Sequence, residues 1–593
     1  MAYLKQLTVR YQQEGLALLV FVVITFYFLY PIVVQPASLV IGRPFDDAFE
    51  SIWYLYWYQH ALFDLKVTPL FQPDIFYPYG WDLGFAVLPP LFPTLLSPLT
   101  AVVGPVAAYN VTIIGSCLLA ATGTFCLARA LGANRQGAVL AGVAYAFYPN
   151  RQVYLYGFLN LLLGSMWLPW LLLGLVQAGR SPYARGRWLA LSGLALALSI
   201  GGAWQSVILS TTAGVIFGFI YLGPAIRREG WGWLRPLTMA ALLCLLVSGP
   251  LLINGLRVRQ ELGVSAVFSI ENLRATSVSL ERLFVPSALN PLFWRLARET
   301  FPLTNGEDGV VTLGLVSPLL AILAISRLRP WNRSVWALVI LALLGLVLML
   351  GPALHIQGRP VLLPIPATPF LQQNLPEILA PEGQVTVPLP ALLLYRLLPP
   401  FRSFHHFGRW GLVSSLATAS LAALGFTWLA GRHRLPRQLM LATGCLLLLA
   451  LELNTQPLPS VTSTQQMERP VDKWLAARPE QSVIIEYPFS YTLKGQSLYY
   501  TIAHRQKIVH GSSLLPAGFA ATLPVLSQWP AAETRDLLRE LGVRYVLVHA
   551  FTGYDFEAEA LPQLLAVDDL RLIDRFPMSL GPVRAIYLFE LSE

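Results

Sequence analysis

Long apolar runs, separated by short arginine-rich segments, dominate the chain up to about residue 455. Runs such as 16–34, 189–200 and 335–350 contain no charged residue. The longest approach the roughly 20 residues that a helix needs to cross a hydrocarbon core of about 30 Å. Only 12% of all residues are charged, against about 25% in soluble domains. The pattern predicts a polytopic α-helical membrane protein whose first run is a span, because that run is too long for a cleavable signal.

The arginine clusters set the predicted topology. Because Lys and Arg favour cytoplasmic loops, the clusters at 129–135, 180–187, 227–235, 327–333 and 432–437 are expected in the cytoplasm, together with Lys5 and Arg10. Helices threaded between them give about eleven spans, with the N-terminus inside and the C-terminus outside. The expected spans are 16–36, 106–130, 136–149, 157–178, 187–202, 204–222, 236–255, 311–327, 334–353, 409–431 and 437–454. The proline-rich segment 88–104 would invert every later arginine loop if it crossed, so we expect it to be re-entrant or interfacial.

This topology divides the chain into a membrane bundle, 1–455, and an extracytoplasmic domain, 456–593. Three long loops, 37–105, 256–310 and 354–408, share the outer side with that domain, so any chemistry is expected there.

The tail after residue 455 changes character. Segments 481–488 and 543–549 have the β-branched composition of buried strands. Segment 531–541 has helical periodicity and ends at Gly542, and 585–591 is expected as a late strand. Alternating strands and helices predict a small α/β domain.

Charge and motifs exclude several functions. The net charge of +9 comes from loops between apolar runs, so membrane topology explains it and nucleic-acid binding is not expected. The four cysteines lie inside apolar runs without paired spacing, which disfavours disulfides and metal sites. The sequence has no P-loop, no GxGxxG after a strand, no GxSxG and no CxxC, so nucleotide-dependent and serine-hydrolase chemistry has no support.

The first outer loop contains the strongest candidate chemistry. Asp46, Asp47 and Glu50 precede a segment in which the aromatic positions 53, 56, 57 and 60 share one helical face. Such a helix is expected to lie along the outer membrane surface and to hold the three carboxylates at the water–lipid boundary, facing the bundle. One carboxylate could take a proton from an acceptor hydroxyl while another orients it or binds a divalent metal. The alternative is that these acids only cap the helix.

A second candidate cluster precedes the tenth expected span. Arg402, His405, His406 and Arg409 stand on the outer side, where the positive-inside rule does not require cations. Arginine binds phosphate through a planar fork, so a lipid-phosphate site is one interpretation. The alternative is that these side chains anchor the span by snorkelling. Two adjacent histidines without further ligands are a weak metal signal, and no metal ligand is assigned.

Four stretches carry a family resemblance. Asp47 with Trp53 and Trp57, the loop DIFYPYG at 74–80, the sequence FRSFHHFGRWG at 401–411, and the tail segments 497–512 and 541–549 look like the C-type glycosyltransferase superfamily. They look more closely like large bacterial membrane proteins placed near it. For the loop 71–80, packing over the bundle mouth is the expected role of most residues.

The resemblance implies a polyprenyl-phosphate-linked sugar donor, an inverting transfer on the outer face of a bacterial plasma membrane, and an acid in the first loop as base. Asp47 is the residue that corresponds, with Asp46 as the alternative. No cofactor follows except an optional divalent metal, and the expected partners are the lipid-linked donor and membrane lipids. The competing hypotheses are a transporter of lipid-linked glycans and a non-catalytic assembly protein. A transporter is disfavoured because almost no charge lies within the expected spans and no repeat is evident.

Overall fold

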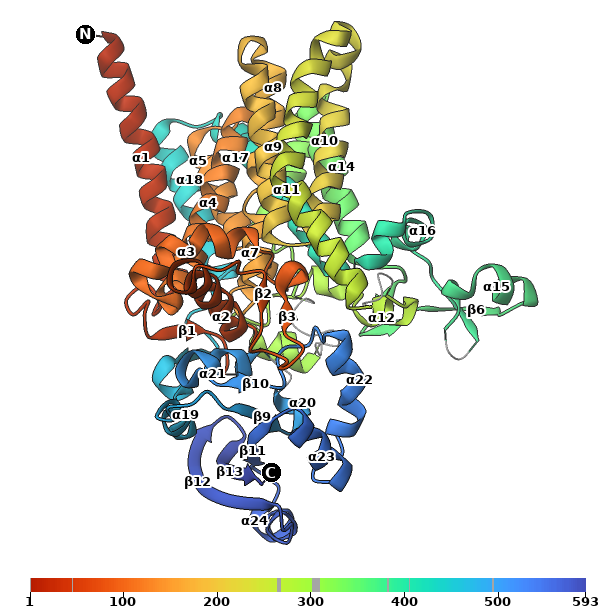
Figure 1. Ribbon diagram of the computed structural model, residues 1–593. Coiled ribbons are helices and arrows are strands. Elements are labelled where there is room, and N and C mark those ends of the chain that lie inside the picture. The colour runs from red at the N-terminus through yellow and green to blue at the C-terminus, as the bar shows by residue number, and fades with distance from the viewer. Residues whose placement is uncertain are drawn as a thin grey trace.

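The computed structural model describes residues 2–44, 46–263, 268–300, 310–380, 383–404, 406–492 and 495–592. It consists of a helical bundle with an α/β domain at one end (Figure 1). The N-terminus lies at the opposite end of the bundle from this domain.

The bundle is formed by helices that overlap the predicted spans. They are α1 (Ala2–Phe28), α4 (Pro105–Leu131), α5 (Arg135–Ala146), α8 (Leu168–Arg180), α9 (Arg185–Gly202), α10 (Ser206–Glu229), α11 (Leu234–Glu261), α13 (Val316–Arg327), α14 (Arg333–Met349), α17 (Gly411–Ala430) and α18 (Leu435–Glu452). The predicted span 157–178 is divided between α7 (Leu159–Ser165) and α8.

Five helical stretches in the described parts of the chain are long and apolar enough to cross a membrane. They are Pro105–Leu131, Leu159–Arg180, Ser206–Glu261, Phe407–Ala430 and Leu435–Glu452. The third contains both α10 and α11. The remaining apolar helices are shorter, so the total of about eleven spans stays a prediction.

Helix α3 (Leu91–Val103) corresponds to the proline-rich segment. Its 13 residues rise about 20 Å, less than the roughly 30 Å of a hydrocarbon core. It packs beneath the bundle against α2 (Ala48–Gln59) and α4 (Figure 1). The re-entrant or interfacial placement of this segment stays a prediction.

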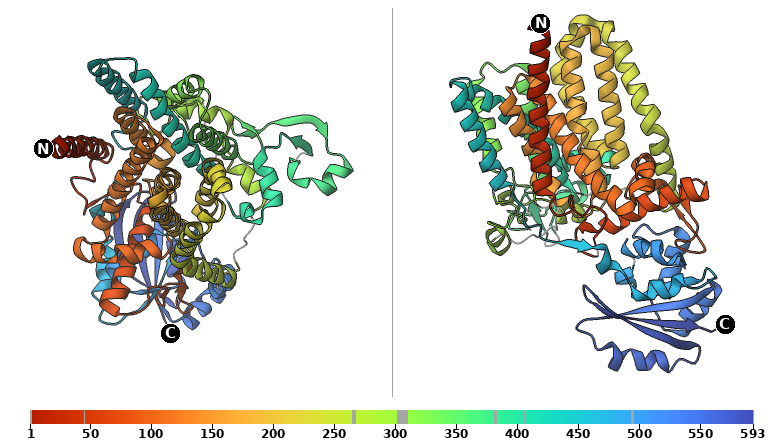
Figure 2. Two further views of the ribbon diagram at one scale, coloured as in Figure 1. Left: turned by 90° about the horizontal axis from the view of Figure 1, so that it is seen from above. Right: turned by 90° about the vertical axis from the view of Figure 1, so that its left-hand side faces the viewer.

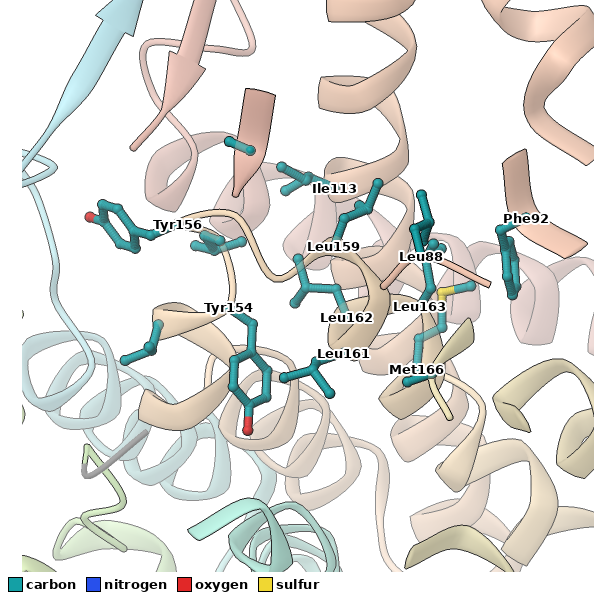
Figure 3. Packing of buried hydrophobic residues seen from close by; sticks show 14 of the residues in the cluster. Leu88, Phe92, Ile113, Tyr154, Tyr156, Leu159, Leu161, Leu162, Leu163 and Met166 are labelled. Atoms are coloured by element: carbon teal, nitrogen blue, oxygen red, sulfur yellow. The ribbon is translucent and has the colours of Figure 1, made fainter. Parts of the chain in front are cut away.

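The bundle core contains a broken helical hairpin. The short helix α6 (Pro149–Val153) and α7 separate α5 from α8. Their apolar side chains fill the interior, where Leu159 and Leu162 lie close to Ile113 of α4 (Figure 3). Six of the seven residues of α7 are buried, so this helix lies inside the molecule.

The C-terminal domain is built on a five-stranded sheet in the order β10-β9-β11-β13-β12. Its strands are β9 (Val483–Tyr487), β10 (Lys507–Ile508), β11 (Val543–Phe551), β12 (Leu570–Leu580) and β13 (Val583–Leu591). Strand β9 is parallel to β10 and β11, whereas β13 is antiparallel to β11 and β12. The predicted strands at 481–488, 543–549 and 585–591 are confirmed as β9, β11 and β13.

Helices pack around this sheet. They are α19 (Pro470–Ala476), α20 (Phe489–Thr492), α21 (Gln496–His504), α22 (Ala517–Leu526), α23 (Ala532–Glu540), α24 (Phe556–Glu559) and α25 (Leu561–Leu565). Helix α23 confirms the predicted helix 531–541, and Gly542 after it has φ +72°, a conformation that glycine adopts without strain.

The first long loop, 37–105, connects the bundle and the C-terminal domain through several contacts. Strand β1 (Leu39–Ile41) pairs with β8 (Val461–Ser463), and α2 packs against α21. The hairpin β2 (Phe71–Gln72) and β3 (Trp81–Asp82) flanks the DIFYPYG loop. Backbone bonds join this loop to the sheet: Ile508 N donates to Asp74 O at 2.8 Å and Tyr77 N donates to Ile508 O at 3.0 Å. The loop thus covers the edge of β10 and does more than close the bundle mouth.

The third long loop, 354–408, forms a lateral arm. It contains β4 (His355–Ile356), β5 (Arg359–Pro360), β6 (Leu362–Pro366), α15 (Pro369–Asn374), β7 (Gln384–Thr386) and α16 (Pro390–Leu397). Seen from above, it extends beyond the outline of the bundle (Figure 2). The second loop contributes α12 (Ile270–Ala275) near its base (Figure 1).

Candidate functional site

The start of α2 presents the two aspartates of the first loop in different ways. Asp46 Oδ2 accepts a hydrogen bond from Arg43 N at 2.6 Å, which closes a tight turn. Asp47 occupies the N-cap position of α2, but its side chain makes no capping hydrogen bond. Asp46 is half-buried and Asp47 is exposed. Asp47 thus makes no side-chain cap, and a favourable interaction of its carboxylate with the positive end of the helix remains the alternative to a catalytic role.

A glycine brings the broken hairpin against this turn. Gly157 has φ +116°, and a Cβ there would lie 2.8 Å from Ala48 N and 3.0 Å from Asp47 N. Ser51 Oγ donates to Gly157 O at 3.4 Å. Only glycine permits this approach without displacing the backbone, so the position of Asp47 depends on the segment that leads into α7.

The prediction that the aromatic face of α2 lies along the membrane surface is wrong. Trp53 and Trp57 are 1% and 4% exposed. Trp53 Nε1 donates to Thr501 Oγ1 of α21 at 3.0 Å, and Trp57 Nε1 donates to Pro69 O at 2.9 Å. The C-terminal domain and the first loop cover the face that periodicity assigned to lipid headgroups, because a tertiary contact buries aromatic rings as readily as an interface does.

Glu50 is buried beneath the C-terminal domain and does not stand at the water–lipid boundary. Its Oε1 accepts hydrogen bonds from Tyr54 Oη at 2.8 Å and from Ser512 Oγ at 2.9 Å. A Cβ on Gly495 would lie 2.3 Å from Glu50 Cβ. Burial, together with the nearby charge of Asp47, raises the pKa of Glu50 to about 7. Glu50 thus belongs to the contact between α2 and the domain.

The second candidate cluster is partly engaged in structural contacts. Arg402 donates from Nε to Tyr395 O and from Nη2 to Arg396 O, both at 3.0 Å. Arg409, 7% exposed, donates from Nη1 to Gln205 Oε1. His406 is half-buried, and its carbonyl accepts from Arg409 N at 3.2 Å. His405 lies outside the described residues.

The two candidate clusters border the same short helix. Asp47 touches the segment before α7, as described above. At the other end, a Cβ on Gly164 would lie 2.6 Å from Ser206 Oγ, next to the Gln205 that binds Arg409. The seven residues of α7 rise about 10 Å. The acidic turn therefore lies near one end of α7, and the Gln205 that binds Arg409 lies near the other end.

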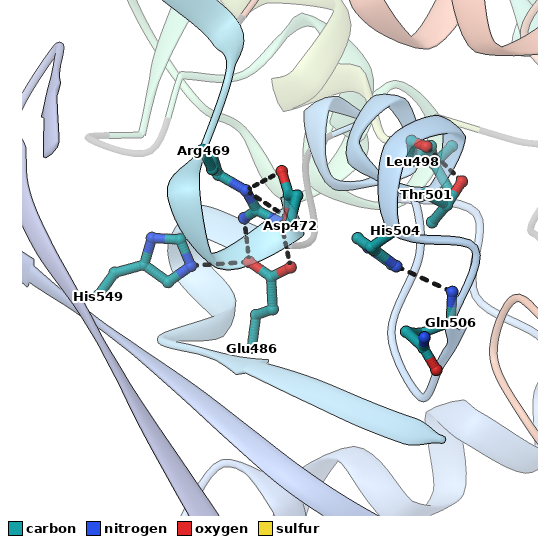
Figure 4. Close-up of polar contacts among 8 residues, drawn as sticks. All are labelled: Arg469, Asp472, Glu486, Leu498, Thr501, His504, Gln506 and His549. Atoms are coloured by element: carbon teal, nitrogen blue, oxygen red, sulfur yellow. Dashed lines mark hydrogen bonds and ion pairs between the residues drawn. The ribbon is translucent and has the colours of Figure 1, made fainter. Parts of the chain in front are cut away.

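The C-terminal domain contains a buried charge network that the sequence analysis did not identify (Figure 4). Arg469 lies between two carboxylates, with Nη2 2.6 Å from Asp472 Oδ1 and Nη1 2.8 Å from Glu486 Oε2. His549 Nε2 lies 2.7 Å from Glu486 Oε2, and the Arg469 guanidinium stacks 3.6 Å over the Tyr500 ring. Glu486 and His549 lie in otherwise apolar predicted strands. This pattern could have revealed the network, because buried polar groups need partners.

Charge compensation explains the protonation of this network. Burial alone would raise the pKa of Glu486, but the Arg469 cation and the His549 hydrogen bond hold it well below its usual range. Burial lowers the pKa of His504 to about 3 and that of His510 to about 4. Among the described residues, no group of three His, Cys, Asp or Glu is placed to hold a metal ion.

Comparison with known proteins identifies the fold. No protein-family model matches the chain, and no curated protein is similar to it in sequence. Among solved structures, the arabinofuranosyltransferase AftD from Mycobacteria superposes with a TM-score of 0.61 at 17% identity, over 98% of this chain and 40% of that one. The Archaeoglobus fulgidus oligosaccharyltransferase gives 0.55 at 12% identity, over 91% and 70%. The same enzyme tethered to an acceptor peptide with the NVT sequon gives 0.52 at 10%, over 91% and 69%.

The chain has the fold of the C-type membrane glycosyltransferases. Two solved enzymes of this class superpose on nearly its whole length, so the resemblance expected from the sequence is confirmed at the level of fold. The chain spans 40% of the length of AftD.

Proposed function

We propose that this protein is an integral membrane glycosyltransferase that moves a sugar from a polyprenyl-phosphate donor to an acceptor on the extracytoplasmic face. The observation that carries the proposal is the acidic turn. In a fold shared with sugar-transferring enzymes, Asp47 is exposed, makes no capping bond and is held in place by the close approach of Gly157.

Asp47 is the proposed base. Its carboxylate takes the proton of an acceptor hydroxyl as the hydroxyl oxygen bonds to the anomeric carbon. The bond between that carbon and the lipid phosphate breaks, and the phosphate leaves with the bonding electrons. Asp46 keeps the turn closed through its bond to Arg43 N. A divalent metal at these aspartates is an optional addition that the assay below tests.

Arg409 and Arg402 are the proposed contacts for the lipid phosphate. A guanidinium stabilises the charge that develops on a leaving phosphate. Arg409 is placed better because it borders α7 through Gln205, whereas Arg402 donates two bonds to backbone carbonyls. His405 and His406 are secondary candidates. Glu50 is reassigned to positioning, since its carboxylate is held by Tyr54 and Ser512.

The proposed orientation puts the N-terminus in the cytoplasm and the C-terminal domain outside, in a bacterial plasma membrane. The arginine-rich turns support it. The turn between α10 and α11, which contains Arg227, Arg228 and Arg235, lies at the end of the bundle remote from the C-terminal domain (Figure 1).

The decisive experiment is sugar transfer by the purified full chain, tested against a panel of polyprenyl-phosphate pentoses and hexoses with and without Mg²⁺ or Mn²⁺. Asp47→Asn is expected to lower the rate about 100-fold or more, since general base catalysis contributes roughly 10²–10⁴-fold. The matched control is Asp64→Asn, an exposed acid of the same loop that pairs with His60 at 2.7 Å. Equal activity of the Asp47→Asn variant and wild type, with both folded, would overturn the assignment.

A further inference from the structure

A second site lies in the bundle, away from the acidic turn. A cavity of about 490 Å³ opens between α8, α9, α10 and α11. This volume is within the roughly 300–1,000 Å³ of small-ligand pockets. Its lining is apolar with few exceptions, and its single charged residue is Arg227. We refer to it as the α10–α11 groove.

The groove opens toward lipid. Val215 and Phe219, which line it from α10, are 64% and 71% exposed. Helices α10 and α11 are consecutive, yet each packs mainly on other helices, α10 on α14 and α8 and α11 on α9. The space between them is therefore a cleft on the membrane-facing side of the bundle.

Glycines hollow out the wall on α10. A Cβ on Gly218 would meet only Leu175 Cδ1 at 3.8 Å, and a Cβ on Gly223 would meet nothing within 4 Å. The lining of α10 extends from Thr211 to Arg227, which corresponds to about 24 Å along the helix. One leaflet of a hydrocarbon core is about 15 Å deep, so the groove accommodates an extended acyl chain together with the start of a headgroup.

Several contacts order the turn that follows Arg227, at the end of α10 remote from the C-terminal domain. Arg185 Nη2 pairs with Glu229 Oε2 at 2.6 Å, and its guanidinium stacks 3.9 Å over the Trp233 ring. Arg227 is exposed and has no ion-pair partner among the described residues. An unpaired cation at the end of an apolar cleft is complementary to an amphipathic anion.

We infer that the α10–α11 groove binds one acyl chain of an anionic phospholipid from the leaflet remote from the C-terminal domain, with the lipid phosphate at Arg227. This site is separate from the proposed sugar-transfer site and does not depend on it. An anionic phospholipid fits better than a lipid-linked sugar donor, because the groove ends at the opposite side of the bundle from the acidic turn (Figure 1).

The test uses the full chain in detergent and follows thermal unfolding with added phosphatidylglycerol or phosphatidylcholine of the same acyl chains. A ligand that binds only the folded state raises Tm, so wild type should be stabilised more by phosphatidylglycerol. Arg227→Gln should weaken phosphatidylglycerol binding about tenfold, the effect of losing a charge-assisted hydrogen bond. Arg228→Gln, an exposed neighbour outside the lining, should leave the preference intact.

A second pair of variants tests the chain-binding part. Gly218→Leu with Gly223→Leu fills the groove without a Cβ collision and should abolish the response to both lipids. Gly115→Leu, at an open position of α4 outside the lining, is the matched control. The inference fails if Arg228→Gln and Arg227→Gln behave alike, or if the filled groove still responds. It also fails if a polyprenyl phosphate binds more tightly than phosphatidylglycerol and displaces it. The groove would then be a binding site for the lipid-linked sugar donor.

Discussion

Two buried glutamates, in neighbouring regions of the molecule, show how the same side chain is held in opposite ways. Glu486 lies in the core of the C-terminal domain with a cation, Arg469, against it. Glu50 lies where α2 meets that domain, and its partners among the described residues are the neutral hydroxyls of Tyr54 and Ser512. The cation stabilises the charged form of Glu486, whereas burial without a cation favours the neutral form of Glu50. Glu486 in the domain core therefore keeps its charge, whereas Glu50 at the junction has a pKa near neutrality.

The largest effect should come from removing the cation. Arg469→Met leaves Asp472 and Glu486 buried without a counter-charge, which typically costs about 3–5 kcal/mol of unfolding free energy. Hydrogen exchange of β9 and β11 in the full chain measures it. Arg478→Met, which removes an exposed arginine stacked on Trp474, is the control and should change little. A small effect at Arg469 would mean that the network is not the stabilising element of the core.

The next effect concerns pH. The pKa of Glu50 rises from 4.5 to about 7 on folding, so its stabilising contribution is full below pH 4.5 and is lost as pH rises through 7. The difference corresponds to about 3 kcal/mol at higher pH. Glu50→Gln keeps an acceptor for both hydroxyls and should remove this pH dependence, as measured by protection of α2 and α21 between pH 5 and 8.

Glu486 should give the opposite dependence of stability on pH. Because its folded pKa lies well below 4.5, its contribution is full above pH 4.5 and is lost as pH falls through the folded value. The contribution of Glu486 to the protection of β9 should therefore be lost in acid. If α2 and β9 lose protection over the same pH range, the contrast between the two glutamates is wrong.

A steric change where α2 meets the C-terminal domain should lower the stability of this junction by an intermediate amount. Gly495→Ala places a Cβ 2.3 Å from Glu50 Cβ, and such overpacking typically costs about 1–3 kcal/mol. Faster proteolysis between α2 and the C-terminal domain is the expected readout. Gly444→Ala, where an added Cβ meets nothing within 4 Å, should have no such effect.

The smallest effect should come from one hydrogen bond. Thr501→Val removes the acceptor of Trp53 Nε1 while keeping the side-chain shape, and a buried donor left unpaired costs about 1–3 kcal/mol. Because Thr501 is partly buried, we expect the lower end of that range, measured by thermal unfolding. Thr522→Val, whose hydroxyl bonds locally to Phe519 O, provides the comparison.

The sequence predicted individual helices and strands better than it predicted which of them pack together. Apolar runs are local properties, so helices such as α4, α17 and α18 and the strands β9, β11 and β13 follow from pattern alone. The hydrophobic pattern of the sequence does not show which helices are buried in the bundle and which are exposed on its surface. The most apolar stretch of Phe407–Ala430 is 83% buried, whereas that of Leu435–Glu452 is only 6% buried.

The candidate site shows the same limit. Asp46 and Asp47 stand out in the sequence as acids after an apolar run, and Asp47 is exposed in the structure. Glu50 belongs to the same motif, yet its neighbours Ser512 and Gly495 come from the distant tail. Likewise, Trp53 belongs to an aromatic stripe that periodicity assigns to the membrane surface, and Thr501 draws it into the junction instead.

The sequence by itself determined that this chain is a multi-span membrane protein with an α/β tail and an acidic first loop, because hydrophobic length and β-branched composition act within single segments. Only the tertiary structure decided that the first loop and the tail form one unit, since the pairing of β1 with β8 and of Asp74 with Ile508 joins residues more than 400 positions apart. Contacts at such a separation depend on the relative placement of whole elements, and local periodicity carries no information about that placement.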